Sequence, residues 1–345
     1  MARLIDVAKE AGVSRATASN VFSNPGRVSA KLRRRVEKAA EALGYLGPDP
    51  KGRLLRDGRF NAIAVLALSD WGVADSLRNP VFDLFLRGVG EACDEVGANL
   101  LIASGRKGEH RIRTALVDGF IFGRLDHVAE LEMARLRRLP FAVVDFDPGP
   151  NISSVRVDAR AGAYAAARHL IDLGHRRFAI MSFLRSSGPA RLHPTGVPRP
   201  PEAAGELTDQ EKLAGYTDAL AEAGLRIDDV PMVQADPWDT SAADMLLSHA
   251  PDATAILSMT IMQAIAIVEA AKRRGLSVPR DLSVVGYNDI REAAQFDPPL
   301  TTVDGMGLEK GRTAARMVFA DGQPRHEIIA PRLIVRRSTG PAPGR

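Results

Sequence analysis

The stretch LIDVAKEAGVSRATASNVFSNPGRVSAKLRRRVEKAAEALGY, residues 4–45, decides the fold of the N-terminal part of the chain. Apolar residues recur in it at helical spacing in three runs, over residues 4–11, 15–22 and 30–43. Gly12 and Gly44 stand where a helix ends in the left-handed conformation, and Ser14 and Ser29 stand where a side chain caps the next helix. Because the first two helices are separated only by a tight corner, the stretch predicts a helix-turn-helix with a third helix. The expected shared core is Leu4, Val7, Ala8, Ala11, Ala18, Val21, Phe22, Val36, Ala39, Ala40 and Leu43.

The second predicted helix carries side chains that suit the edges of DNA bases. In a helix-turn-helix this helix enters the major groove, about 12 Å wide, with its first residues toward the bases. Arg15 can make a bidentate contact with guanine, Asn20 can pair with adenine, and Ala16 offers a methyl contact to thymine. Small hydroxyl donors for phosphate surround them at Ser14, Thr17, Ser19 and Ser29. Taken singly, each of these serines is more often a helix cap than a DNA contact.

The positive charge of the chain is concentrated at its N-terminus. Residues 1–59 contain 13 Lys and Arg against 6 Asp and Glu, a net charge of +7, whereas the remainder contains 33 against 36, a net charge of −3. A cationic segment on a mildly acidic body suits a polyanion such as DNA, since binding releases condensed counterions. A solvated basic face would explain the charge equally well, so the interpretation depends on the helix-turn-helix.

Composition excludes several classes of protein. The chain of 345 residues is 45% hydrophobic and 26% charged, which is typical of globular domains. Its one cysteine, Cys93, excludes an intramolecular disulfide framework and a Cys-rich zinc module. No run of about 18 apolar residues occurs, and Asp6 and Glu10 interrupt any apolar leader at the N-terminus. We therefore expect a soluble, cytoplasmic protein that has no membrane partner.

Nothing in the sequence organises catalysis. No Gly-x-Gly-x-x-Gly or Walker loop follows a predicted strand, no Gly-x-Ser-x-Gly elbow occurs, and the seven histidines form no metal-spaced pair. We expect no enzyme activity, no cofactor and no metal site. A binding protein of the transport type would need export and would have no use for a DNA-reading segment.

Residues 4–46 resemble the headpiece of LacI/GalR-family transcription repressors. The matching motifs are Leu4-Ile5-Asp6-Val7-Ala8, Ala11-Gly12-Val13-Ser14, Thr17-Ala18-Ser19, Val28-Ser29 and Leu43-Gly44-Tyr45. The resemblance implies that the base-reading positions are Arg15, Ala16 and Asn20. It implies that the phosphate-contacting positions are Ser14, Thr17, Ser19, Ser23, Arg27 and Ser29.

Residues 47–60 are predicted to be a hinge between two domains. Residues 47–59 contain two prolines and three glycines, which leaves room for one or two helical turns at most. The resemblance implies that this segment folds into a short helix on DNA and inserts a leucine into the minor groove. The matching residue is Leu55, with Leu54 as the competing position. An ordinary flexible linker is the alternative.

From Asn61 onward, short apolar runs alternate with helical patterns, which is typical of βαβ units and parallel sheets. The first series predicts strands at 62–68, 100–103, 119–122 and 141–145 and a helix at 80–96. The second series predicts helices at 159–173 and 211–223, a strand at 178–183, and strands near Met232, Ile256 and Val284. Two doubly wound parallel-sheet lobes are therefore expected.

The resemblance extends over this region. The motifs are Leu173-Gly174-His175-Arg176-Arg177, Ala214-Gly215-Tyr216, residues 281–289 (DLSVVGYND) and residues 298–303 (PPLTTV). They look like the family's effector-binding and dimerisation domain, an α/β fold similar to periplasmic sugar-binding proteins. It would cover residues 61–339, followed by a tail at 340–345. Lobe N would take about 61–157 and 290–321, and lobe C about 158–289 and 322–339, with a ligand in the cleft at the carboxyl ends of the strands.

The resemblance also implies a set of effector-binding residues, carried over by position: Asp70, Phe82, Arg124, Asp158, Lys212, Trp238, Thr260, Asn288 and Asp289. An aromatic ring such as that of Trp238 gives a flat face to a sugar, and polar groups can hold its hydroxyls. Two alternatives stay open, because Asp158 can be a helix N-cap and Trp238 can be a core residue.

Residues 186–210 are rich in Pro and Gly. They form either a lid on the cleft or a disordered insertion, and we favour the disordered insertion.

These features predict a sequence-specific transcriptional regulator. The first hypothesis is a repressor of catabolic genes that binds an inverted-repeat operator as a homodimer or tetramer and is controlled by a small sugar-like effector. The second is a co-repressor-activated or partner-protein-controlled regulator of the same fold with a non-sugar ligand. In both, a ligand that favours one arrangement of the lobes changes the affinity for DNA.

Overall fold

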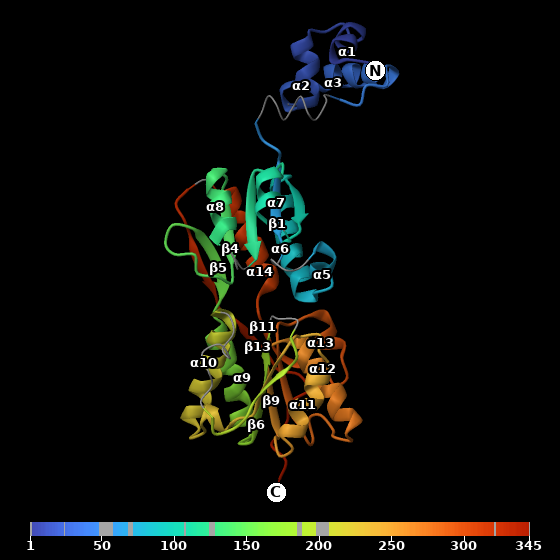
Figure 1. The fold of residues 1–345 in the computed structure, drawn as a ribbon. Helices are drawn as coiled ribbons and strands as arrows, with labels where there is room; N and C mark the ends of the chain where they lie inside the picture. Colours follow the sequence, from blue (N-terminus) through green and yellow to red (C-terminus); the bar gives the residue numbers. More distant parts are fainter. Residues whose placement is uncertain are drawn as a thin grey trace. The chain divides into compact units, whose positions relative to one another are not determined.

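The computed structural model divides the chain into two compact units, Met1–Phe60 and Asn61–Arg345, shown in Figure 1. We call them the three-helix unit and the two-lobed unit. The structure describes residues 2–23, 25–47, 58–67, 72–106, 108–123, 128–184, 188–197, 207–320 and 322–344. Leu54, Leu55 and most of the predicted hinge lie outside these residues.

The three-helix unit has the predicted helix-turn-helix. Its elements are α1 (Leu4–Glu10), α2 (Arg15–Ser23), the short η1 (Pro25–Arg27) and α3 (Ala30–Ala42). Gly12 and Gly44 both adopt the left-handed conformation, with φ of +59° and +62°. Ser14 Oγ accepts from the N–H of Thr17 at 3.1 Å, and Ser29 Oγ accepts from the N–H of Leu32 at 3.4 Å, so both serines cap helices.

The small core of this unit is almost the predicted one. Its buried residues are Val7, Ala8, Ala11, Ala18, Val21, Val36, Ala39 and Ala40. Leu43 was expected inside and is 38% exposed, because α3 ends at Ala42 and Leu43 becomes its C-cap. Tyr45 packs there instead, with its ring edge-on to Phe22 at 5.5 Å between centroids.

Lobe N of the two-lobed unit is built on a parallel sheet with the strand order β12-β5-β4-β3-β1-β2. The strands are β1 (Ala62–Leu66), β2 (Asn99–Ala103), β3 (Gly119–Gly123), β4 (Phe141–Val144), β5 (Ser153–Val157) and β12 (His326–Ile329). The helices are α5 (Val73–Leu77), α6 (Pro80–Val96), α7 (Gly108–Thr114), α8 (Val128–Leu136) and α14 (Gly307–Phe319).

Lobe C is built on a second sheet with the strand order β13-β11-β10-β9-β6-β8-β7, in which only the edge strands β7 and β13 pair antiparallel. The strands are β6 (Phe178–Phe183), β7 (Arg191–His193), β8 (Met232–Ala235), β9 (Ala255–Ser258), β10 (Ser283–Tyr287), β11 (Thr301–Asp304) and β13 (Arg332–Ile334). The helices are α9 (Ala159–Asp172), α10 (Leu207–Glu222), η3 (Ile227–Asp229), α11 (Ser241–His249), α12 (Ile261–Arg273) and α13 (Arg291–Gln295). Two doubly wound lobes are therefore confirmed.

Two of the three expected crossings between the lobes lie elsewhere. The chain leaves lobe N after β5, close to the expected position 158. It does not return near 290, because Ile290, Ala293 and Leu300 are buried in the core of lobe C and β11 pairs with β10, so the return follows β11. The final crossing lies between β12 and β13 rather than near 322, because β12 pairs with β5 of lobe N. The expected tail also packs on lobe C, where Ala342 donates its N–H to the carbonyl of Leu173 at 2.9 Å.

Helices α6 and α14 lie against each other in lobe N, and this contact depends on glycine (Figure 1). A Cβ added to Gly88 would stand 1.9 Å from the carbonyl oxygen of Leu308, and one added to Gly311 would stand 2.1 Å from that of Phe85. The larger buried side chains of α6 are Phe85, Leu86, Val89 and Cys93, whereas Val96 is exposed because the helix ends there. The close approach fixes how α14 sits on the sheet.

Residues 186–210 are predicted to form a lid or, as the favoured interpretation, a disordered insertion, and the structure corrects part of this prediction. Residues 191–193 form β7 at the edge of lobe C, paired with β8, and α10 begins at Leu207. Residues 185–187 and 198–206 lie outside the described part of the chain.

Among the residues that the structure describes, no helix has the length and apolar character needed to cross a membrane.

Candidate functional site

The N-terminal turn of α2 presents the predicted base-reading side chains. Arg15 and Ala16 are exposed in this turn, and Asn20 is half-buried one turn later. Ser14, directly before the helix, caps it and also lies 2.8 Å from the Thr17 hydroxyl, oxygen to oxygen. The first turn of α2 therefore presents a guanidinium and a methyl group to solvent, and an amide follows one turn later.

The predicted phosphate-contacting residues surround this turn with different degrees of exposure. Ser14, Arg27 and Ser29 are exposed, whereas Thr17, Ser19 and Ser23 are half-buried. Ser23 donates its hydroxyl to the carbonyl of Ser19 at 2.9 Å. The alternative of helix capping holds for Ser14 and Ser29, and a capping hydroxyl on the surface can still meet a phosphate. The exposed cations on α3 are Lys31, Arg33, Arg34 and Arg35.

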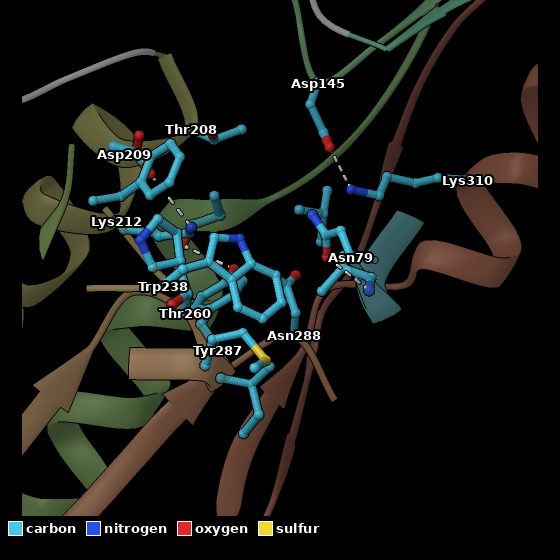
Figure 2. Close-up of a pocket in the computed structure, with 17 residues that line it drawn as sticks. Asn79, Asp145, Thr208, Asp209, Lys212, Trp238, Thr260, Tyr287, Asn288 and Lys310 are labelled. Atoms are coloured by element: carbon cyan, nitrogen blue, oxygen red, sulfur yellow. Dashed lines mark hydrogen bonds and ion pairs between the residues drawn. The ribbon is translucent and has the colours of Figure 1, made fainter. Parts of the chain in front are cut away.

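A pocket of about 170 Å³ lies between the two lobes of the two-lobed unit, and Figure 2 shows its side chains. Lobe N contributes Asn79, Val81, Asp145, Val157 and Lys310. Lobe C contributes Ala159, Phe183, Thr208, Asp209, Lys212, Pro237, Trp238, Thr260, Ile261, Met262, Tyr287 and Asn288. Several of these follow the carboxyl ends of parallel strands, as Asp145 does after β4 and Asn288 after β10, which is where such sheets bind ligands. We call this cavity the interlobe pocket.

Four of the residues predicted to bind an effector meet in the interlobe pocket. They are Lys212, Trp238, Thr260 and Asn288. Trp238 is 44% exposed and lines the wall, so the core interpretation of this residue does not hold. Thr260 caps α12 by accepting from the N–H of Gln263 at 3.2 Å. Asn288 has a φ of +72°, a left-handed conformation that asparagine tolerates better than most residues.

The other predicted residues take different places. Phe82 stacks on Phe85 at 6.1 Å between ring centroids and packs against the core of lobe N. Asp158 caps α9 by accepting from the N–H of Ala161 at 2.9 Å. Asp289 forms a bidentate ion pair with Arg336, at 2.7 and 2.9 Å. None of these three is among the described residues that line the interlobe pocket, and Asp70 and Arg124 lie outside the described residues.

The wall from lobe N carries a charge pair that sequence reasoning missed. Lys310 of α14 donates to Oδ2 of Asp145 at 2.5 Å, and the Lys310 side chain is 9% exposed. Asp145 has a φ of +55°, so its backbone is held in the left-handed region directly after β4. The other carboxylate oxygen, Oδ1, is buried and has no hydrogen-bond partner in the described part of the chain. Asn79 caps α6 beside this pair, accepting from the N–H of Val81 at 3.0 Å.

The wall from lobe C carries a second pair of the same two residue types. Lys212 Nζ lies 3.5 Å from Oδ1 of Asp209 and donates to the carbonyl of Met259 at 3.1 Å. The same ammonium lies 4.5 Å from the centroid of the Tyr287 ring, within the range of a cation–π contact. Oδ2 of Asp209 is buried and, among the described residues, no group donates a hydrogen bond to it. Burial raises the pKa of Tyr287 well above its ordinary value, so this phenol stays protonated.

A further charge pair joins the lobes outside the pocket. Arg156 of β5 donates through Nη1 to Oε1 of Glu211 on α10. Burial raises the pKa of Glu211, and the nearby Arg156 acts in the opposite direction. Asp158 lies beside this pair, on a shallower hollow with a volume of about 350 Å³. The contact ties a strand of one lobe to a helix of the other.

Comparisons with known proteins agree with this architecture. The profile described as bacterial regulatory proteins, lacI family, matches residues 3–47, and that of the periplasmic binding protein-like domain matches residues 167–339. The HTH-type transcriptional regulator DegA of Bacillus subtilis is 32% identical, over 98% of each chain. The HTH-type transcriptional repressor CytR of Escherichia coli is 29% identical, over 99% of this chain and 97% of the relative. The solved structure of the transcriptional regulator CelR–cellobiose complex superposes with a TM-score of 0.69 at 25% identity, over 98% of this chain and all of that one.

Proposed function

The chain belongs to the lacI family of bacterial regulatory proteins, which are DNA-binding transcriptional regulators and not enzymes, and we propose that this member is a repressor of catabolic genes. In this proposal a small sugar-like effector binds in the interlobe pocket and controls the affinity for an inverted-repeat operator. The protein acts as a homodimer or tetramer, so that two copies of α2 meet two half-sites. The repressor named among its relatives supports the direction of control.

The observation that carries the proposal is that both lobes line one pocket. Asp145 and Lys310 come from lobe N, and Lys212 and Trp238 come from lobe C. A ligand that touches both walls binds more tightly to one arrangement of the lobes, and it therefore shifts the population toward that arrangement. Such coupling is typically about 1–3 kcal/mol, which corresponds to a 5- to 150-fold change in the affinity for DNA.

A sugar-like ligand fits the polar and aromatic side chains of the pocket. Trp238 offers a flat apolar face, and carboxylate, ammonium, amide and hydroxyl groups surround it. The cavity is smaller than the roughly 300–1,000 Å³ typical of drug-sized ligands, which favours a compact molecule. A structural relative was solved with cellobiose, which supports the class of ligand.

The DNA side of the proposal keeps the roles given to the headpiece. Arg15, Ala16 and Asn20 read bases, and the phosphate contacts come from Ser14, Thr17, Ser19, Ser23, Arg27 and Ser29. Leu55 is the proposed minor-groove wedge. The positive charge of residues 1–59 supplies a salt-dependent attraction that any duplex shares.

The test is to select an operator from random duplexes with the full chain and to measure its affinity with and without sugars across a salt titration. We expect a preferred inverted repeat whose affinity falls 5- to 150-fold when the effector is present. A ligand that raises the affinity would instead support the co-repressor hypothesis. If no duplex is preferred over scrambled competitor, the proposal of operator control is wrong.

Replacing one base-reading side chain tests the groove assignment. Arg15→Ala should relax the preference at one operator position and cost about 1–3 kcal/mol of discrimination, because a bidentate contact to guanine is lost. Arg33→Ala, on the exposed face of α3, is the matched control, since loss of a phosphate contact weakens all sequences about equally. Equal effects of both substitutions on every duplex would contradict the assignment.

A further inference from the structure

The described residues that line the interlobe pocket include four charged side chains, and they form two pairs of the same kind. Asp145–Lys310 belongs to lobe N and Asp209–Lys212 belongs to lobe C. Figure 2 shows the two pairs on opposite sides of the cavity, with Trp238 between them. The pocket therefore has no net charge from its described lining, although it is strongly polar on both walls.

Each pair leaves hydrogen-bonding capacity unused at the carboxylate. Asp145 Oδ1 and Asp209 Oδ2 are buried, and no described residue donates to either oxygen. The Asp209 side chain is only 4% exposed, so water reaches it poorly. A buried carboxylate oxygen without a donor is destabilising, and a ligand hydroxyl that donates to it relieves that cost. The structure thus holds one acceptor for a ligand on each wall.

Buried ion pairs of this kind are weak stabilisers of a fold. The loss of hydration of both charges offsets most of their attraction, and apolar residues of similar volume often serve stability as well or better. Lys310 and Lys212 are each buried, with side chains 9% exposed. The two pairs are therefore better explained by what they bind than by what they contribute to folding.

An Asp–Lys pair in which one aspartate oxygen lacks a donor favours one kind of ligand group. A hydroxyl donates one hydrogen bond and accepts others, so it can donate to the carboxylate and accept from the neighbouring ammonium. A phosphate or carboxylate only accepts, and the aspartate would repel it. An ammonium only donates, and the lysine would repel it. Since both walls carry the same pair, the same selection applies at both ends of the ligand.

We propose that the interlobe pocket selects an uncharged, polyhydroxylated ligand of monosaccharide size, with one hydroxyl bound by Asp145–Lys310 and another by Asp209–Lys212. The ligand thereby bridges the two lobes. This inference rests on the proposed function in taking the interlobe pocket as the effector site. It goes further in excluding phosphorylated, acidic and amino sugars as effectors.

The first experiment compares ligand charge on the unmodified full chain by isothermal titration calorimetry. The uncharged probes are glucose, galactose and ribose, and the charged probes are glucose 6-phosphate, galacturonate, ribose 5-phosphate and glucosamine. We expect at least one uncharged probe to bind, and its charged counterpart to bind at least 10-fold more weakly. Absence of binding by every uncharged probe, or tighter binding by a charged one, overturns the proposal.

The second experiment tests the two walls with Asp145→Asn and Asp209→Asn. Each should weaken the best uncharged probe about 10- to 100-fold, because a hydrogen bond to a carboxylate is replaced by one to a neutral amide. Asparagine tolerates the left-handed backbone of position 145, so the fold is retained there. Asp218→Asn is the matched control, since Asp218 also lies on α10 but pairs with Arg160 at 2.7 Å outside the pocket. Unchanged affinity in both pocket variants overturns the proposal, and the charge comparison decides it if a variant does not fold.

Operator binding separates a failure of this inference from a failure of the proposed function. If glucose 6-phosphate or another charged probe binds best and releases the operator, regulation stands and the uncharged ligand is wrong. If an uncharged probe binds through both aspartates but leaves operator affinity unchanged, the ligand class stands and the regulation is wrong.

Discussion

The three-helix unit and the two-lobed unit differ in how far apart along the chain their internal contacts lie. In the three-helix unit, Arg35 donates to the carbonyl of Gly12, 23 residues earlier. In the two-lobed unit, Lys310 pairs with Asp145 across 165 residues, and Arg312 pairs with Glu91 across 221. Short-range contacts make the first unit readable from its caps and turns. Long-range contacts make the second depend on how distant segments pack.

The largest expected effect comes from the close approach of α6 and α14. Gly88→Ala would place a Cβ 1.9 Å from the carbonyl oxygen of Leu308, so we expect the two-lobed unit to lose about 3 kcal/mol of its free energy of unfolding. Urea denaturation followed by tryptophan fluorescence measures this, because Trp71 and Trp238 both lie in that unit. Gly90→Ala, on the same helix with no heavy atom within 4 Å, should instead stabilise by about 0.5–1 kcal/mol. Equal behaviour of the two variants would show that the helix contact is not tight.

A core truncation in the three-helix unit should stay confined to it. Val36 is fully buried among the three helices, and Val36→Ala should cost that unit about 2 kcal/mol. Hydrogen exchange of the α1–α3 amides in the full chain measures the loss, while the tryptophan-detected transition should not move. Leu46→Ala, at a fully exposed position, should change exchange by less than about 0.5 kcal/mol. A shift of the tryptophan transition in Val36→Ala would mean that the two units unfold together.

Loss of a helix cap should have a smaller effect on the same unit. Ser14→Ala removes the acceptor for the N–H of Thr17 and should cost about 1 kcal/mol in the exchange of the α2 amides. Ser14→Asp keeps a capping oxygen and should restore that stability. It should also weaken binding to every duplex, because it places a negative charge near phosphate. If Ser14→Asp binds DNA as tightly as the parent, Ser14 lies away from the backbone.

The smallest expected effect is a pH dependence confined to the two-lobed unit. Burial lowers the pKa of His169 and of His175, and residues 1–60 contain no histidine. The unfolded chain, with a histidine pKa of about 6.5, then binds more protons than the folded chain below that pH. The free energy of unfolding should therefore lose nothing to these two histidines above about pH 6.5, and it should fall as the pH drops below that value. Urea midpoints by tryptophan fluorescence at pH 7.5 and 5.5 measure this, and His169→Asn combined with His175→Asn should reduce the difference. An equal difference in the double variant would assign it to other groups.

Much of the three-helix unit could be predicted from the sequence because each signal acts within a few residues. Ser14 and Ser29 cap the helices that directly follow them, and Gly12 and Gly44 end the helices that directly precede them. The one error in its core, Leu43, arose at a helix end, where one residue more or less of helix changes the side that a residue faces.

The alternation of strands and helices in the two-lobed unit was equally readable, but its crossings were not. The strand β12 carries mostly exposed side chains at the edge of its sheet, so the sequence contains no long apolar run that would predict a strand there. The helix α13 has five residues, and only its burial in lobe C shows to which lobe residues 291–295 belong. Short elements at a boundary are assigned by their partners in the fold and not by their own pattern.

The two walls of the interlobe pocket mark the limit of what the sequence by itself determined. Asp209 and Lys212 lie one helical turn apart in α10, but the sequence predicted that helix only from residue 211 and placed Asp209 in the 186–210 stretch, so their pairing required the observed start of α10 at Leu207. Asp145 was predictable only in part, because it ends a predicted strand at the edge of the sheet where ligands bind. Its partner Lys310 lies on a helix that reaches lobe N only after the chain has built most of lobe C. The local chain thus determined the headpiece and the strand–helix order, whereas the structure decided both Asp–Lys pairs, because Asp209 joins α10 only when that helix begins at Leu207 and only the docking of α14 brings Lys310 to Asp145.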